Sequence, residues 1–225
     1  MYIHTIHSRI ANIHVLANEY GVVIVDAGFA NAAPLVMNKI KQLRYSPRDV
    51  RLIFLTHAHI DHVGSAAELR ERTGAPIALH RADAAKARAG KHNLPNGRGA
   101  LGKALEHSFN GLHLKFRYKA FEPDVWLNDG QTLRDFGFDA RVMHTPGHTL
   151  GSVSLCFADG IFLIGDVMIN QVRVGMPMYG EDTVLAYESL RKIAALRPRV
   201  LYSGHGEPFS GNDIARYFEM KNLMP

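Results

Sequence analysis

Short apolar runs alternate with amphipathic stretches along most of this chain. The runs rich in β-branched residues predict buried strands at residues 22–25, 51–55, 77–79, 140–144, 152–157, 161–164 and 200–202. Apolar residues that recur every three or four positions predict helices that begin near Pro34, Val63, Ala82, Thr183 and Ile214. Because strands and helices mix in both halves, we expect an α/β or α+β fold of layered sheets and helices.

The composition is that of an ordinary globular chain, and it excludes a disordered, collagenous or coiled-coil protein. Of 225 residues, 47% are hydrophobic and 21% are charged. No Pro-, Ser- or Gly-rich linker divides the chain, so we expect a single domain over residues 1–225. The single cysteine, Cys156, excludes an internal disulfide framework and is predicted to be a small buried strand residue. With no signal-peptide core and no apolar run of ~18–20 residues, we expect a cytoplasmic protein without a membrane partner.

The formal charge of +5 raises the question of an anionic partner. Basic side chains are enriched between residues 86 and 119, at Lys86, Arg88, Lys91, Arg98, Lys103, Lys115, Arg117 and Lys119. They could form a basic rim for an anionic ligand or simply a solvated surface. A nucleic-acid partner is disfavoured, because the segment is not a compact basic run with interleaved aromatic residues. The Gly- and Pro-rich stretch at 93–102 is either a binding loop or a surface insertion.

The strongest candidate chemistry lies just after the strand predicted at 51–55. In an extended chain His57 and His59 point to the same side, and the turn that follows directs Asp61 and His62 to a neighbouring point. A catalytic zinc ion usually takes three protein ligands, so four ligand-type side chains within six residues indicate two ions.

Three more motifs follow later strands. Pro146 and Gly147 turn the chain and present His148, Asp166 ends an apolar run, and His205 lies between two glycines. His144 is a rival ligand but is better interpreted as a packing residue, and Asp166 alone could be a turn cap. Five histidines and two aspartates together suit Zn²⁺ and also accept Fe or Mn. The segments VVIVDAG and IFLIGDV are similar, because in each a predicted buried strand is followed by an aspartate. They are a weak signal of an internal repeat.

These motifs resemble those of the metallo-β-lactamase superfamily, and the resemblance spans nearly the whole chain. It rests on His-x-His-x-Asp-His at 57–62, Pro-Gly-His at 146–148, Gly-Asp at 165–166, Gly-His-Gly at 204–206 and the Asp-Ala-Gly turn at 26–28. The resemblance implies a four-layer αββα sandwich with a metal site at one edge of its two sheets. It also implies that one ion is bound by His57, His59 and His148 and a second by Asp61, His62 and His205, with Asp166 between them.

The sequence differs from three known subfamilies of this superfamily, and these differences limit the activities that we expect. True β-lactamases carry Cys or Ser where Asp166 stands, which argues against antibiotic hydrolysis. Glyoxalase II-type thioesterases carry a C-terminal helical domain for glutathione, whereas this chain continues only about twenty residues past His205. Quorum-quenching lactonases usually have Tyr where Ile169 stands, so residues 167–180 are expected to form a different substrate wall.

We therefore expect a dinuclear, metal-dependent hydrolase in which a metal-bridging hydroxide attacks the ester, thioester or lactone carbonyl of a small molecule. Asp61 and Asp166 are the expected catalytic residues. Arg173 could anchor a carboxylate, and Tyr179 and Tyr202 could polarise a carbonyl, although these residue types are more often found on the surface or in packing. The alternatives on the same fold are a phosphodiesterase or RNA-processing nuclease and a persulfide dioxygenase with a single iron.

Overall fold

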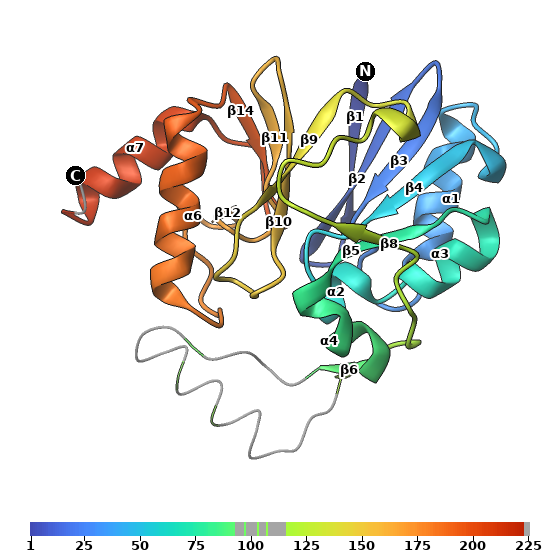
Figure 1. The fold of residues 1–225 in the computed structure, drawn as a ribbon, viewed down its shortest axis with the longest axis horizontal. Coiled ribbons are helices and arrows are strands. Elements are labelled where there is room, and N and C mark those ends of the chain that lie inside the picture. The colour runs from blue at the N-terminus through green and yellow to red at the C-terminus, as the bar shows by residue number, and fades with distance from the viewer. Residues whose placement is uncertain (93–96, 98–102, 104–106, 108–115, 223–225) are drawn as a thin grey trace.

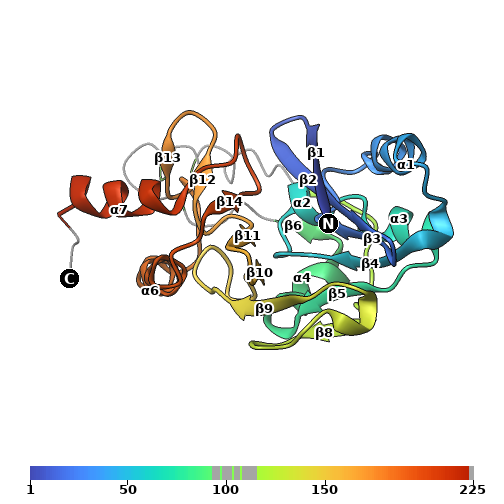
Figure 2. The same cartoon turned by 90° about the horizontal axis from the view of Figure 1, so that it is seen from above.

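The chain folds into four layers in the order helix, sheet, sheet, helix (Figure 1, Figure 2). The computed structural model describes residues 1–92, 97, 103, 107 and 116–222. In both views the two sheets lie between α1, α3 and α4 on one side and α6 and α7 on the other. The αββα sandwich predicted from the sequence is therefore confirmed.

The first sheet contains six strands in the order β1-β2-β3-β4-β5-β8. Their bounds are β1 (Tyr2–Ser8), β2 (Ala11–Asn18), β3 (Gly21–Val25), β4 (Val50–Phe54), β5 (Ile77–His80) and β8 (Val125–Leu127). The first three strands pair antiparallel, and β3, β4, β5 and β8 pair parallel. Parallel neighbours require crossover connections, and helices supply them here.

The second sheet contains four strands in the order β14-β11-β10-β9. Their bounds are β9 (Ala140–His144), β10 (Val153–Phe157), β11 (Ile161–Leu163) and β14 (Val200–Tyr202). Since β10 is antiparallel to both β9 and β11, and β11 is parallel to β14, the strands β9, β11 and β14 all run in one direction.

The helices cover the outer faces of the sheets, and the remaining short strands pair in two further two-stranded sheets, β6-β7 and β12-β13. The helices are α1 (Ala33–Gln42), α2 (Ile60–Val63), α3 (Ala66–Thr73), α4 (Ala84–Ala89), α6 (Thr183–Ala195) and α7 (Gly211–Met220). Short 3-10 turns occur at η1 (Pro47–Asp49), η2 (Arg81–Asp83) and η3 (Arg134–Phe136), and the remaining strands are β6 (Lys91–His92), β7 (Phe116–Arg117), β12 (Ile169–Asn170) and β13 (Val174–Gly175). None of the helices within the described residues is both long and apolar enough to cross a bilayer.

Three hydrophobic clusters fill the three interfaces between the layers. One packs α1 and α3 on the first sheet, for example through Val36 and Leu69. The second joins the two sheets through Phe54 and Leu155, and the third packs α6 and α7 on the second sheet through residues such as Leu190. Burial of these apolar faces holds the four layers together.

The direction of the strands brings distant loops to one edge of the sandwich. The loops that carry the sequence motifs follow the carboxyl ends of β3, β4, β9, β11 and β14. Strands that run in the same direction end at the same edge of a sheet, so side chains far apart in the sequence meet there.

A substitution in the middle cluster tests this arrangement. Leu155 is fully buried between the sheets, whereas Leu35 on α1 is 50% exposed. Leu155→Ala should lower the free energy of unfolding by about 2–5 kcal/mol, and the matched Leu35→Ala should change it by less than about 0.5 kcal/mol. Urea unfolding followed by circular dichroism measures both. Equal effects of the two substitutions would contradict the placement of Leu155 in the core.

Candidate metal centre

The structure brings together all seven side chains that the sequence motifs singled out. They are His57, His59, Asp61, His62, His148, Asp166 and His205. They fall into three overlapping groups, and in each group one ligand-type atom from every member lies within 4.8 Å of the others. They come from the loops that follow β4, β9, β11 and β14 and from the short helix α2, which holds Asp61 and His62. The directions of these strands predict that the segments after them meet.

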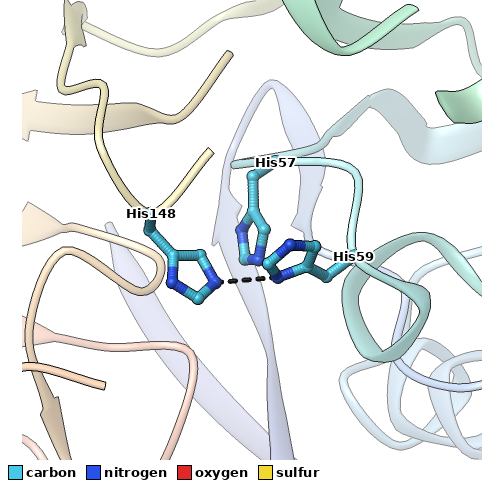
Figure 3. A group of neighbouring side chains, drawn as sticks. All are labelled: His57, His59 and His148. Carbon is cyan, nitrogen blue, oxygen red and sulfur yellow. Dashed lines mark hydrogen bonds between the residues drawn. The ribbon is translucent and has the colours of Figure 1, made fainter. Parts of the chain in front are cut away.

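One group consists of three buried histidines, His57, His59 and His148 (Figure 3). The ring centroid of His57 lies 4.7 Å from those of both His59 and His148. The Nε2 atom of His148 lies 2.8 Å from the Nδ1 atom of His59. The rings point toward one another from two different loops, which is a suitable arrangement for ligands of one cation.

The second group, Asp61, His62 and His205, lies beside the first, and Asp166 lies between them. The Nε2 atom of His205 is 3.3 Å from a carboxylate oxygen of Asp61 and 3.1 Å from Oδ2 of Asp166. The same Asp166 oxygen is 3.4 Å from Nε2 of His148, which belongs to the first group. One carboxylate therefore faces histidines of both groups.

Hydrogen bonds at Nδ1 fix how four of the histidines present their other ring nitrogen. His148 and His205 donate through Nδ1 to the carbonyl oxygens of Tyr179 and Ile10, at 3.0 and 2.7 Å. Because a carbonyl can only accept, the proton of the neutral ring must be on Nδ1, and Nε2 is the nitrogen that offers its lone pair to a metal.

The histidines His57 and His62 are oriented in the same way by a buried carboxylate, Asp26. His62 donates through Nδ1 to Oδ2 of Asp26 at 2.8 Å. Thr56 donates its hydroxyl to Asp26, so the same hydroxyl oxygen is left to accept from Nδ1 of His57 at 3.0 Å. Asp26 thus directs the Nε2 atoms of both histidines toward the centre of the site.

Several atoms that face the centre are buried and unpaired. Within the described residues, Nε2 of His57, Nε2 of His62 and Oδ1 of Asp166 have no hydrogen-bond partner. A buried polar atom without a partner costs about 1–3 kcal/mol, so such a cluster is unfavourable unless something binds it. Imidazole and carboxylate donors around one point fit a divalent cation.

The charges of the cluster are strongly coupled. Burial alone would lower the pKa of His62, but the carboxylates of Asp166, Asp26 and Asp61 outweigh it and raise that pKa to about 9. In the same way, Asp166 and Asp61 overcome burial and raise the pKa of His205 to about 11. Burial, together with the neighbouring histidines, lowers the pKa of His57 well below 6.5.

The loop that carries His205 is held by β2, a strand that the sequence did not predict. Asn12 donates through its side chain to the carbonyl oxygens of Ser203 and Gly206, and His14 donates through Nε2 to that of Ser203. Burial lowers the pKa of His14 to about 4, so this ring is neutral. The polar residues that interrupt the apolar pattern of β2 are therefore anchors for the site.

Glycine at position 204 is required by close packing inside the site. A Cβ atom there would lie 2.2 Å from Oδ1 of Asp166 and 2.5 Å from Cε1 of His62. No other residue type allows the His205 loop to approach this closely.

The remaining candidate residues lie outside the cluster. His144 stacks on His80 with ring centroids 4.2 Å apart and donates through Nε2 to the carbonyl of Leu150, as expected for a packing residue. Tyr202 packs edge-on against His14. Tyr179 contributes its backbone carbonyl to His148, and the exposed Arg173 lies in a groove formed by β12, β13, α6 and α7.

The basic stretch at 86–119 is partly neutralised. Arg88 pairs with Glu122, Lys119 with Glu71, and Lys86 with both Asp83 and Glu181. Lys91, Lys103 and Arg117 are exposed, and Arg98 and Lys115 lie outside the described residues, as does most of the stretch at 93–102. These pairings reduce the charge available for an anionic partner.

Curated relatives resemble the chain over most of its length. A probable metallo-hydrolase of Bacillus subtilis, YflN, is 28% identical over 94% of this chain and 86% of its own. A hydroxyacylglutathione hydrolase of Cereibacter sphaeroides is 29% identical over 96% of this chain and 73% of its own. GloC, a hydroxyacylglutathione hydrolase of Haemophilus influenzae, is 25% identical over 84% of this chain and 82% of its own.

Solved structures show the same fold. The B3 metallo-beta-lactamase BLEG-1 superposes with a TM-score of 0.74 at 27% identity, with both chains fully covered. TTHA1623, solved in a di-iron-bound form, superposes with a TM-score of 0.70 at 24% identity over 96% of this chain and 98% of its own. The family model of the metallo-beta-lactamase superfamily matches residues 8–205. The chain therefore belongs to the metallo-beta-lactamase superfamily, and it is a metal-dependent hydrolase.

Proposed function

We propose that this protein is a dinuclear metal-dependent hydrolase that cleaves the carbonyl–heteroatom bond of a small thioester, ester or lactone. The observation that carries the proposal is the set of imidazoles whose Nδ1 atoms are engaged by Tyr179, Ile10, Asp26 and Thr56, so that their Nε2 atoms converge. Rings fixed in this way are prepared to bind cations before any ion arrives.

We assign the proposed ligands to two ions, one at each of the two groups that share no member; the third group, His57, His62 and Asp166, overlaps both of these groups. His57, His59 and His148 would hold one ion, and Asp61, His62 and His205 the other, with Asp166 contributing to both. When bound, divalent ions would lower the pKa of a water molecule to about 7 and would polarise the substrate carbonyl. The ligand set suits zinc and also accepts iron or manganese.

Two carboxylates of the chain would serve the reaction besides holding metal. Asp61 is 17% exposed, whereas His62 beside it is fully buried, so we propose that the substrate approaches from the side of Asp61. Although burial raises the pKa of Asp61, the neighbouring His62 outweighs it and lowers that pKa, so the carboxylate is ionised and can hold a cation; we propose that it also relays a proton during turnover. Asp166 stays ionised because His205, His62 and His148 overcome its burial and lower its pKa.

Thioesters are the first substrate class to test. Relatives named hydroxyacylglutathione hydrolase act, by that name, on an acyl thioester, and they match 96% and 84% of this chain. A nuclease gains no support, because three basic side chains of the 86–119 stretch are paired with acids.

A hydrolysis panel tests the proposed activity. The protein as purified should contain about two divalent ions per chain by elemental analysis and should hydrolyse hydroxyacyl thioesters or lactones but not a phosphodiester. Removal of the ions with a chelator should abolish turnover, and added Zn²⁺ should restore it. Turnover that persists without metal, or cleavage of the phosphodiester alone, would contradict the proposal.

Substitutions of the ligands give a second prediction. His59→Ala and Asp166→Ala should lose at least one ion and nearly all turnover, because each removes a side chain that faces the centre. The matched control His144→Ala removes a histidine that stacks on His80 outside the cluster and should keep both ions. Metal content and kcat measure the effect of each substitution. If only His144→Ala lost metal, the ligand assignment would be wrong.

The pH dependence of metal binding should differ between the two groups. His62 and His205 have pKa values raised to about 9 and about 11, so at pH 7 both carry a proton that a metal must displace. Affinity at this group should therefore rise with pH between 6.5 and 8.5, by about tenfold per pH unit for each proton displaced. His57, whose pKa is lowered, has no such proton to lose, so the three-histidine group should respond less. Zinc titration against a competing chelator at several pH values measures the affinity of both sites. Identical slopes of affinity against pH at the two sites would contradict the assignment.

A further inference from the structure

Another buried carboxylate, Asp83, contacts both loops that carry the three histidines but is not a member of that group. Asp83 ends the turn η2 and is 0% exposed. Its Oδ2 atom accepts two hydrogen bonds, from the backbone N–H of Ala58 at 2.8 Å and from the hydroxyl of Thr149 at 2.7 Å. A fully buried carboxylate is rare and is retained where its hydrogen bonds hold something in place.

The two donors come from the two loops that carry the three histidines. Ala58 lies between His57 and His59, and Thr149 directly follows His148. One oxygen atom of Asp83 thus joins the loop after β4 to the loop after β9. The packing around it is tight, because a Cβ atom at Gly151 would lie 2.6 Å from Cγ of Asp83.

The charge of Asp83 is balanced by a network that returns to the same loop. Lys86 places Nζ 2.6 Å from Oδ1 of Asp83 and 2.7 Å from Glu181. Glu181 accepts from the N–H of Leu150 at 2.6 Å, and its own N–H donates to the carbonyl of His148 at 3.0 Å. The network therefore contacts the backbone on both sides of Thr149.

We propose that Asp83 is a positioning residue that sets the relative placement of the two loops and thereby the affinity of the three-histidine group for its metal ion. This inference rests on the proposed metal binding. Asp26 holds His62 directly and His57 through Thr56, whereas Asp83 acts through the backbone of Ala58 and the side chain of Thr149. The two carboxylates therefore act on different parts of the site, and loss of Asp83 should weaken one ion and spare the other.

The substitution Asp83→Asn tests this role with little change of volume. An asparagine that keeps its oxygen toward Ala58 and Thr149 must turn its NH₂ group toward Nζ of Lys86, so that two donors meet. Zinc titration of the metal-free protein should show one of two sites weakened about 10–100-fold, the effect typical of losing a group that orients metal ligands. The control Asp139→Asn removes an exposed carboxylate that pairs with Arg134 and should leave both sites unchanged.

A matched pair at position 149 keeps the test decisive if Asp83→Asn does not fold. Thr149→Val removes only the hydroxyl that Asp83 accepts, whereas Thr149→Ser keeps it. Thr149→Val should weaken the same single zinc site, and Thr149→Ser should retain wild-type affinity. The absorption of the Co²⁺-loaded protein adds a readout of ligand geometry, and it should change in Thr149→Val but not in Thr149→Ser.

The outcomes separate this inference from the proposed function. Wild-type protein that binds no zinc would overturn both. Wild-type protein with two ions, beside folded Asp83→Asn or Thr149→Val variants that keep both ions at unchanged affinity, would overturn only the role of Asp83. Equal weakening of the two sites would also overturn the role of Asp83, because that result indicates a general loss of stability and not an effect on the three-histidine group.

Discussion

The orientation of buried imidazoles by fixed acceptors at Nδ1 is the interaction on which this site depends. A histidine that donates through Nδ1 to a backbone carbonyl, as His148 and His205 do, cannot carry its only proton on Nε2. The lone pairs at the centre are therefore set by the scaffold, and the buried atoms that no protein group pairs with, such as Nε2 of His57, face the same point. Desolvating these groups costs free energy that a bound cation would offset.

The topology of the two sheets brings the metal-site residues together. Strands β9, β11 and β14 run in one direction in the second sheet, and β3 and β4 are parallel in the first. Their carboxyl ends place five loops at a common edge. Two buried carboxylates then tie these loops together: Asp26 joins the end of β3 to the loop after β4, and Asp83 joins that loop to the one after β9. Rigid layers behind the loops keep the donors in position without metal.

Local patterns in the sequence were sufficient for most core strands and for the seven candidate ligands, because apolar runs and closely spaced histidines are local signals. The order of the layers followed from the resemblance that these motifs carry, and not from the local patterns. The strand β2 was missed because Asn12 and His14, which bind the loop of His205, interrupt its apolar pattern. The strand β1 was missed as well, because polar residues are interspersed with apolar ones in a strand that is mostly only half-buried. Asp26 appeared only as part of a turn and a faint repeat, and Asp83 gave no signal. Both act through contacts made by distant segments, which no local pattern encodes.

The most direct test of the central claim is anomalous scattering from crystals of this protein soaked with zinc. The account predicts two peaks about 3.5–4 Å apart, one about 2.0–2.1 Å from Nε2 of His57 and the other at the same distance from Nε2 of His62, with Asp166 facing both. A single peak elsewhere, for example at the stacked pair His80 and His144, or no peak at these seven side chains, would contradict it.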